Sequence, residues 1–156
     1  MRIWGLGLAM VLGCMAAMAQ GQGAASPPAP VAVAQTDGGI TVWPKGVPPA
    51  GTKVVDFGDH TMTIGHRDQN GRAELHQTKS DVIVIQTGTA TLVTGGEVID
   101  PVTTGPNEIQ GSGIKDGVKH EVGPGDVIEI PAGVPHQFFL APGTQITYLL
   151  VKVVKH

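Results

Sequence analysis

The chain has 156 residues, of which 41% are hydrophobic, with 23 Gly, 12 Pro and a formal net charge of −3. This length suits one domain of ordinary size, and the small negative charge, without a run of Lys or Arg, excludes nucleic acid as the expected partner. Gly and Pro beside many Val, Ile and Thr residues favour short strands separated by turns, so we expect an all-β fold.

Residues 1–19 have the form of a signal peptide. Arg2 precedes an apolar run over residues 3–18, and Ala17-Met18-Ala19 offers the small residues of a cleavage site. The run is too short to favour a permanent membrane span. We therefore expect an exported protein, either periplasmic or secreted. The alternative is a lipoprotein signal in which Cys14 carries the lipid.

Residues 20–50 are rich in Gly, Ala, Pro and Gln and show no hydrophobic periodicity. The prolines between residues 26 and 30 favour an extended and mobile chain, so we expect a flexible linker or N-terminal arm. Within it, residues 40–43 can pair only as a short edge strand, because prolines follow closely. A single folded β domain is then expected over residues 51–156.

Strand signals become regular from Lys53. Residues 53–57 form one candidate strand and residues 61–67 a second, which ends at an Asn70-Gly71 pair that favours a hairpin turn. Alternation places His60 and His66 on one face of the second strand, from which either could approach a metal ion. The favoured interpretation of both is a histidine that forms hydrogen bonds or faces solvent near a strand end.

Residues 72–77 form the next expected strand, in which Glu74 and His76 share one face. Same-face neighbours on a strand lie about 6.5 to 7 Å apart at the backbone, so their side chains can converge on one ion. Asp81 begins another strand that ends at Gly88. Because a closed barrel joins strands that are distant in sequence, it can bring these side chains together with others.

The following region predicts a hairpin and then a long connection. Residues 89–94 and 97–99 are interpreted as two strands of a hairpin about Gly95-Gly96. Residues 100–117 lack a clear pattern. Long connections are often binding loops, so this segment is expected either near the mouth of the domain or as a plain surface excursion. A strand over residues 118–122 follows.

A short β-branched run lies between Gly125 and the turn Pro131-Ala132-Gly133. This pattern predicts a strand ended by a tight turn. The turn delivers His136 to the start of another apolar strand over residues 138–140. A last strand over residues 144–154 is apolar enough to be largely buried.

Two motifs in this pattern resemble those of the cupin superfamily. The second cupin motif, G-x5-P-x-G-x2-H, matches residues 125–136, and its histidine usually binds a metal ion. The first motif is matched in the variant form E-x-H-x4-D-x6-G, with Glu74 in place of a histidine and Asp81 in place of a glutamate. The resemblance implies a small single-domain bacterial cupin with a β-barrel of the double-stranded β-helix or jelly-roll type.

The resemblance further implies one divalent metal ion bound by Glu74, His76, Asp81 and His136. Two imidazoles and two carboxylates, without a thiolate, suit Mn, Fe(II), Ni or Zn better than Cu(I). In one alternative, Glu74 stays off the metal and acts as a general base, which leaves a triad of two histidines and one carboxylate. In another, the motif positions persist in a barrel that binds no metal.

Three functions are compatible with such a site, because one fold hosts many reactions. The first is an enzyme that acts on a small polar organic molecule by oxygen insertion, isomerisation or lyase chemistry. The second is a non-catalytic module in which the metal organises a pocket for binding or sensing a small molecule. The third is a structural or storage barrel. Related cupins are often dimers, and the apolar last strand could support a homodimer.

Overall fold

The structure, a computed structural model, describes residues 36–37, 40–43, 46 and 54–155. The expected signal peptide, the lipid-bearing Cys14 of its alternative and most of the expected linker lie outside these residues. The chain divides into two units, Met1–Pro30 and Val31–His156, and the described residues all belong to the second. Within the described part of the chain, no helix is long and apolar enough to cross a membrane.

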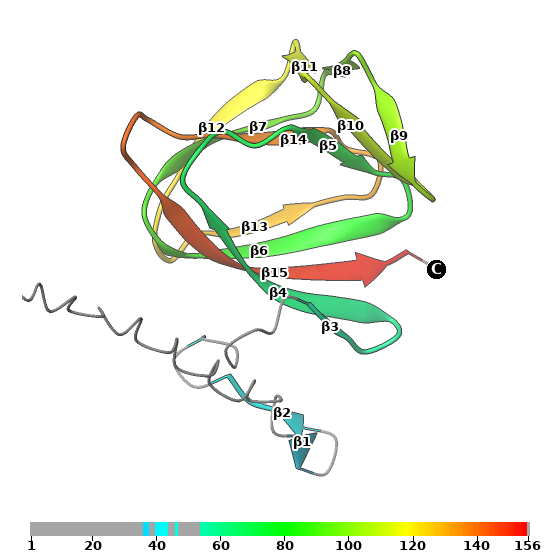
Figure 1. The fold of residues 1–156 in the computed structure, drawn as a ribbon, viewed down its shortest axis with the longest axis vertical. Helices are drawn as coiled ribbons and strands as arrows, with labels where there is room; N and C mark the ends of the chain where they lie inside the picture. The colour runs from blue at the N-terminus through cyan, green and yellow to red at the C-terminus, as the bar shows by residue number, and fades with distance from the viewer. Residues whose placement is uncertain (1–35, 38–39, 44–45, 47–53, 156) are drawn as a thin grey trace, which may run out of the picture. The chain divides into compact units, whose positions relative to one another are not determined.

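Two antiparallel sheets lie face to face, which confirms the predicted all-β class and the double-sheet cupin-type fold (Figure 1). The six-stranded sheet has the order β12-β7-β14-β5-β10-β9, and the five-stranded sheet has the order β13-β6-β15-β4-β3. The strands of the first are β5 (Ala73–His76), β7 (Ala90–Thr94), β9 (Val102–Gly105), β10 (Glu108–Gly111), β12 (Val118–Val122) and β14 (His136–Phe139). Those of the second are β3 (Val55–Asp56), β4 (His60–Arg67), β6 (Lys79–Thr87), β13 (Val127–Ile130) and β15 (Ile146–Val154).

Two small sheets complete the described elements. β8 (Glu97–Ile99) pairs with β11 (Gly113–Lys115), and β1 (Thr36–Asp37) pairs with β2 (Ile40–Thr41). The expected strand over residues 40–43 is therefore present as β2, in a shorter form.

The hydrophobic core fills the space between the two large sheets. Along β6 the inward residues Asp81, Ile83 and Ile85 are buried, while the residues between them are half-buried, as the alternation of a strand requires. Leu92 and Ile146 are among the largest fully buried side chains. Asp81 thus belongs to the inward-facing row of a core strand, and its carboxylate is buried beside aliphatic side chains.

The hairpin expected at Asn70-Gly71 is wrong. β4 pairs with β15 and β3, whereas β5 pairs with β10 and β14, so this turn connects the two large sheets. The turn is held by the far end of β14: the Asn70 side-chain oxygen accepts a hydrogen bond from Leu140 N at 2.8 Å, and Gly71 N donates one to Phe138 O at 2.9 Å. Long-range pairing therefore outweighs the local turn preference.

The hairpin expected at Gly95-Gly96 is also wrong, because β7 pairs with β12 and β14 and β8 pairs with β11. The two glycines let the chain leave one sheet for another. Both have a left-handed backbone, with φ of 74° and 71°, and a Cβ on Gly96 would lie 2.1 Å from Lys115 O. The glycine pair thus permits a close crossing between strands.

Residues 100–117 contain three strands, which corrects the expectation of a long unpatterned connection. β9 and β10 form a hairpin around Asn107, whose φ is 61°, and β10 then pairs with β5 along its whole length. β9 is mostly exposed, so it carries none of the apolar alternation by which strands are recognised in a sequence. Its partner β10 places Glu108 directly opposite His76.

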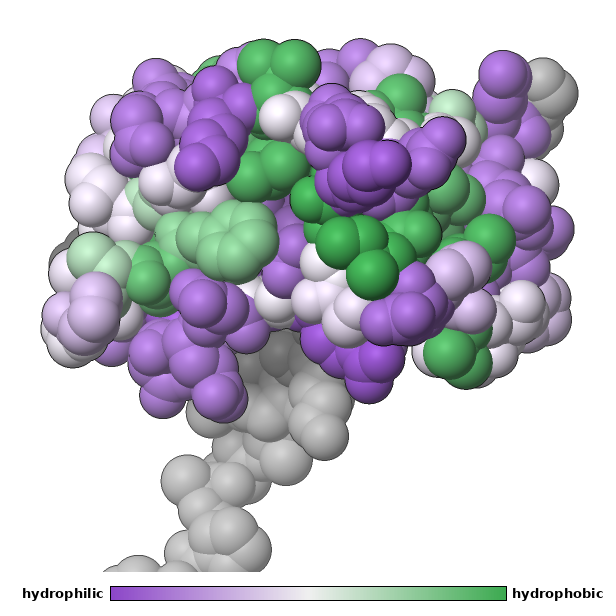
Figure 2. Space-filling view, turned by 90° about the horizontal axis from the view of Figure 1, so that it is seen from above, coloured by the Kyte–Doolittle hydropathy of each residue, from purple (hydrophilic) through white to green (hydrophobic). Residues whose placement is uncertain are grey.

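The last strand is confirmed and occupies the centre of its sheet. β15 pairs with β6 on one side and with β4 on the other. Large hydrophobic side chains remain exposed elsewhere, including Val118 and Val127 on the edge strands β12 and β13. On the face shown in Figure 2, hydrophobic groups lie in patches separated by hydrophilic ones.

Candidate metal centre

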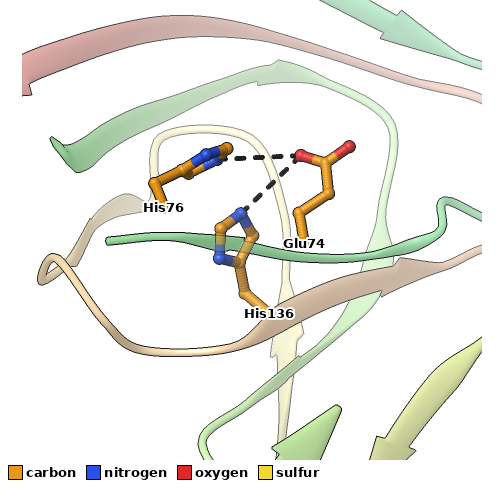
Figure 3. A group of neighbouring side chains, drawn as sticks. All are labelled: Glu74, His76 and His136. Atoms are coloured by element: carbon orange, nitrogen blue, oxygen red, sulfur yellow. Dashed lines mark ion pairs between the residues drawn. The ribbon is translucent and has the colours of Figure 1, made fainter. Parts of the chain in front are cut away.

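The four residues expected to bind a metal meet between the two large sheets. Glu74 and His76 project from the same face of β5, and His136 lies at the start of β14, where it is paired with Glu74. Asp81 comes from β6 in the opposite sheet. In Figure 3 both imidazoles point toward the carboxylate of Glu74. The expected convergence of side chains from distant strands is therefore present.

The turn of the second motif is tied to the strand of the first motif. Gly133 has φ of 84°, a conformation that favours glycine, and its N–H donates a hydrogen bond to His76 O at 2.8 Å. Ala132 N donates to the hydroxyl of Ser80 at 3.2 Å. These bonds set the point at which the chain enters β14 and so position His136 beside His76, with their ring centroids 5.2 Å apart.

The spacing of the donor atoms fits a small divalent ion. Asp81 Oδ2 lies 3.4 Å from Nε2 of both histidines, and Glu74 Oε2 lies 3.9 Å from each of the same nitrogens. Two atoms that bind one ion at about 2.0 to 2.2 Å lie about 3.0 to 3.6 Å apart when they are neighbours in its coordination shell. The aspartate spacing falls in this range, and the glutamate spacing is slightly longer. One donor atom each from Glu74, His76 and His136 lie within 4.8 Å of one another.

The outer nitrogens of both imidazoles have acceptors. His76 Nδ1 is hydrogen-bonded to the carboxylate of Glu108, which Lys79 approaches to 3.5 Å, and His136 Nδ1 lies 3.2 Å from Val134 O. A neutral imidazole that donates its Nδ1–H outward presents the lone pair of Nε2 to the centre. Glu108 was missed by the sequence analysis because β10 was not recognised as a strand.

Lys152 also enters the cluster, and the sequence analysis did not single it out. Its Nζ lies 3.0 and 3.2 Å from the two carboxylate oxygens of Asp81 and 2.5 Å from Nε2 of His76. One signal could have found it: Lys152 has the same parity on β15 as the buried Ile146 and Tyr148, so a regular strand directs it inward.

The cluster shifts the acidity of its members. Burial by itself would raise the pKa of Asp81, but the two imidazoles and the Lys152 ammonium outweigh it and hold that pKa far below its ordinary value. For His76, burial lowers the pKa and so does Lys152, whereas contacts with Asp81 and Glu108 raise it; the net direction is upward. Asp81 is therefore a buried carboxylate that is charged at neutral pH.

Arg67 and Tyr148 form a polar wall beside Glu74. The Arg67 guanidinium lies 3.7 Å from Glu74 Oε1, donates a hydrogen bond to the Tyr148 hydroxyl at 3.0 Å and packs over the Phe138 ring at 5.9 Å. Burial raises the pKa of Tyr148, so the phenol stays protonated. These residues line a cavity of about 50 Å³ together with Glu74, Asp81, His136 and Lys152, and it has room for a few water molecules or one small polar group.

The two histidines of β4 lie outside the cluster. His60 Nδ1 is hydrogen-bonded to Asp59 at 2.6 Å and its ring stacks on Phe57, while the exposed His66 is hydrogen-bonded to Thr147 at 3.1 Å. The favoured interpretation of both, as hydrogen-bonding or solvent-facing histidines, is confirmed.

The positions of the side chains allow Glu74 to act either as a metal ligand or as a general base.

No protein-family model matches the chain, and no curated protein does. Several solved structures are similar to it at low identity. The polyketide cyclase RemF from Streptomyces resistomycificus is 22% identical over 66% of this chain and 56% of its own, with a TM-score of 0.42. A cupin protein from Bacteroides fragilis is 18% identical over 67% and 79% of the two chains, with a TM-score of 0.42. Hydroquinone 1,2-dioxygenase from Sphingomonas sp. TTNP3 is 10% identical over 65% and 63%, with a TM-score of 0.49. The chain thus spans little more than half of the first of these proteins.

Proposed function

We propose that this chain, which has the cupin fold, binds one divalent metal ion and acts on a small polar organic molecule. The observation that carries the proposal is the meeting of His76 and His136 with Glu74 and Asp81 inside the barrel. The histidines are 7% and 5% exposed, so this is not a chance cluster of surface groups. The donor set suits Mn, Fe(II), Ni or Zn. Location in the periplasm or outside the cell rests on the form of residues 1–19 alone.

Glu74, His76 and His136 would hold the ion, with Asp81 beside them. When bound, the ion would supply a Lewis acid that polarises an oxygen of the substrate. Glu74 is the more accessible carboxylate, with 25% of its side chain exposed against 3% for Asp81. In the alternative, His76, Asp81 and His136 would hold the ion, and Glu74 would be free to accept the proton whose removal begins an isomerisation or an elimination.

Arg67 orients the two polar groups on the accessible side of the site, the Glu74 carboxylate and the Tyr148 hydroxyl. Its guanidinium neutralises Glu74 from one side and fixes the Tyr148 hydroxyl, so both groups face the cavity in defined directions. A fixed donor and a fixed carboxylate are what a small polar molecule needs for a single bound orientation.

The second candidate is a non-catalytic module in which the metal organises a binding pocket. Arg67 and Tyr148 line a cavity of about 50 Å³ that would hold one small polar group of a bound molecule, and binding alone requires no further reacting group. The two functions differ in one measurement. Steady turnover of a small polar substrate with Fe(II) or Mn(II), lost in His136→Ala, indicates an enzyme, whereas saturable binding without turnover indicates a binding module.

The metal-binding part of the proposal is tested by His76→Ala. We expect this variant to lose most of its bound metal, measured by elemental analysis of protein purified from its native compartment, while its circular dichroism stays that of a β protein. Removal of one of a few ligands to an ion lowers the affinity for that ion strongly, whereas the hydrophobic core cluster, to which His76 does not belong, keeps all its side chains.

His66→Ala is the matched control, because it removes an exposed histidine of the same domain. Equal metal content in His76→Ala, His66→Ala and the parent would contradict the proposed site. A parallel Glu74→Gln variant separates the two roles of that residue: lost metal indicates a ligand, and retained metal with lost activity indicates a base.

A further inference from the structure

The amine of Lys152 lies against the side of His76 that an ion at the centre would bind. Its Nζ is 2.5 Å from Nε2 of His76 and within 3.2 Å of both oxygens of Asp81. A neutral imidazole nitrogen has one lone pair, which can accept a hydrogen bond or bind a metal, but not both at once. The ammonium group and a metal ion therefore exclude each other at His76.

We infer that Lys152 is an internal competitor of the metal ion. It holds the centre together in the metal-free protein and must move aside before an ion can bind His76 and gain Asp81 as a further ligand. The inference rests on the proposed function, because it concerns the same ligand residues, and it adds the residue that sets how tightly the chain binds metal.

The charges of the cluster support this exchange. Asp81 has 3% of its side chain exposed, and an unpaired carboxylate at such a depth is strongly unfavourable. In the metal-free protein Lys152 supplies the compensating positive charge. A divalent ion at the centre would supply that charge instead, and the ammonium group would then be a like charge a few ångströms away, which is repelled.

The surroundings of Lys152 allow it to move. Its side chain is 22% exposed, whereas that of Asp81 is 3% exposed, so the amine has access to solvent and the carboxylate does not. The backbone is held between two strands, with Lys152 paired to Asp81 on β6 and to Thr61 on β4. A four-carbon stem with free rotation can therefore turn the ammonium outward while the strand stays in place.

The test is a calorimetric titration of metal-stripped protein with Mn²⁺, comparing the parent with Lys152→Met. Methionine keeps an unbranched side chain of similar length and removes the competing charge. We expect Mn²⁺ affinity to rise by about tenfold to a hundredfold, the range that corresponds to one hydrogen bond from a charged donor.

Lys79→Met is the matched control. It removes the same charge close to the site, since Lys79 Nζ lies 3.5 Å from Glu108 Oε1, but its amine contacts the outer carboxylate and not the Nε2 side of His76. General electrostatic attraction of the cation would strengthen binding in both variants alike. Direct competition strengthens it far more in Lys152→Met.

A second variant covers the case in which Lys152→Met does not fold without metal. Lys152→Gln keeps a hydrogen-bond donor for Asp81 and lacks the positive charge, and circular dichroism with and without Mn²⁺ shows whether each variant is folded. A variant that folds only when Mn²⁺ is present supports the inference, because the ion then replaces the lysine.

The outcomes separate the inference from the proposed function. If the parent binds Mn²⁺ and the two Lys152 variants bind it no more tightly than the parent does, the inference is overturned and the proposed function stands. If only the Lys152 variants bind, the inference is supported and metal binding by the natural chain is contradicted. If neither the parent nor the variants bind, both are overturned.

Discussion

Asp81 is a carboxylate in a row of aliphatic side chains on β6, and its ionised form is stabilised by three partners. This makes it the residue on which the acid stability of the domain depends. Its pKa is far below the ordinary value in the folded chain, whereas in the unfolded chain it is about 3.9. The free energy that its charge contributes is therefore fully present above about pH 4 and is lost as the pH falls toward the folded value.

Asp81→Asn should remove this pH dependence. In urea unfolding with a chelator present, we expect the unfolding free energy of the parent to fall more steeply between about pH 4 and pH 2 than that of the variant. Asp116→Asn is the control, because Asp116 has 81% of its side chain exposed and asparagine tolerates its φ of 59°. Parallel pH profiles of the parent and Asp81→Asn would contradict the role of the buried carboxylate.

At the scale of single residues, the sequence predicts the members of the two motifs but not their partners. Glu74, His76 and His136 follow from parity and motif spacing, and the structure brings them together. Lys152 escapes prediction because a lysine on an apolar strand is ordinarily placed at the solvent side. Glu108 escapes because its position depends on a pairing between β10 and β5 that no local pattern encodes.

At the scale of elements, glycines decide where strands can pass close to one another. Gly88 ends the first motif with φ of 77°, and a Cβ there would lie 1.9 Å from Gln145 O. Because this oxygen is a backbone atom, it can move away only if the chain at Gln145 shifts. The glycine of the motif is therefore required for the approach of β6 to the start of β15, and not only for a turn.

Gly88→Ala should destabilise the domain much more than Gly143→Ala. Gly143 has the same φ of 77° but has open space around its Cβ position, so it measures the conformational cost alone. That cost is about 1 to 2 kcal/mol. We expect Gly88→Ala to exceed it by at least about 2 kcal/mol in urea unfolding, because a backbone contact must also be broken. Equal losses would show that the close approach is easily relaxed.

Most of the strands that the sequence predicts well have a buried or half-buried face. β4, β5, β6, β7 and β15 lie within a few residues of their expected positions, because apolar alternation or β-branched runs mark them. The mostly exposed β12 and β13 are found as well, from the valine and isoleucine residues in them. The two hairpins were wrong for a different reason: Asn-Gly and Gly-Gly pairs mark a sharp turn but not the strand that pairs next. Register across the barrel depends on contacts between residues far apart in the chain.

For the whole molecule, a ligand that binds only the folded chain should raise its stability. The proposed ligand residues come from β5, β6 and β14 in both sheets, so they meet only when the two sheets are packed together. At a Mn²⁺ concentration about 100 times the dissociation constant, the gain is about 2.7 kcal/mol. We expect a higher melting temperature of the parent with Mn²⁺, measured by calorimetry, and no shift for a variant that carries both His76→Ala and His136→Ala.

An equal rise in the melting temperature of the double variant would show that Mn²⁺ binds elsewhere on the chain.

The expected homodimer stays a prediction. β15 cannot extend its sheet into a second copy, because both of its edges are paired, so a dimer would have to use other surfaces, such as the edge strands with Val118 and Val127.

The central place of β15 also bears on the order in which the molecule can be assembled. β4 and β6 are neighbours of β15 and have no ladder with each other, although both precede it in the chain. During synthesis, these two strands leave the ribosome with their facing edges open, and they stay so until β15 has emerged. The nascent chain therefore cannot complete this sheet early, and premature termination before β15 would leave two unpaired edges open to aggregation.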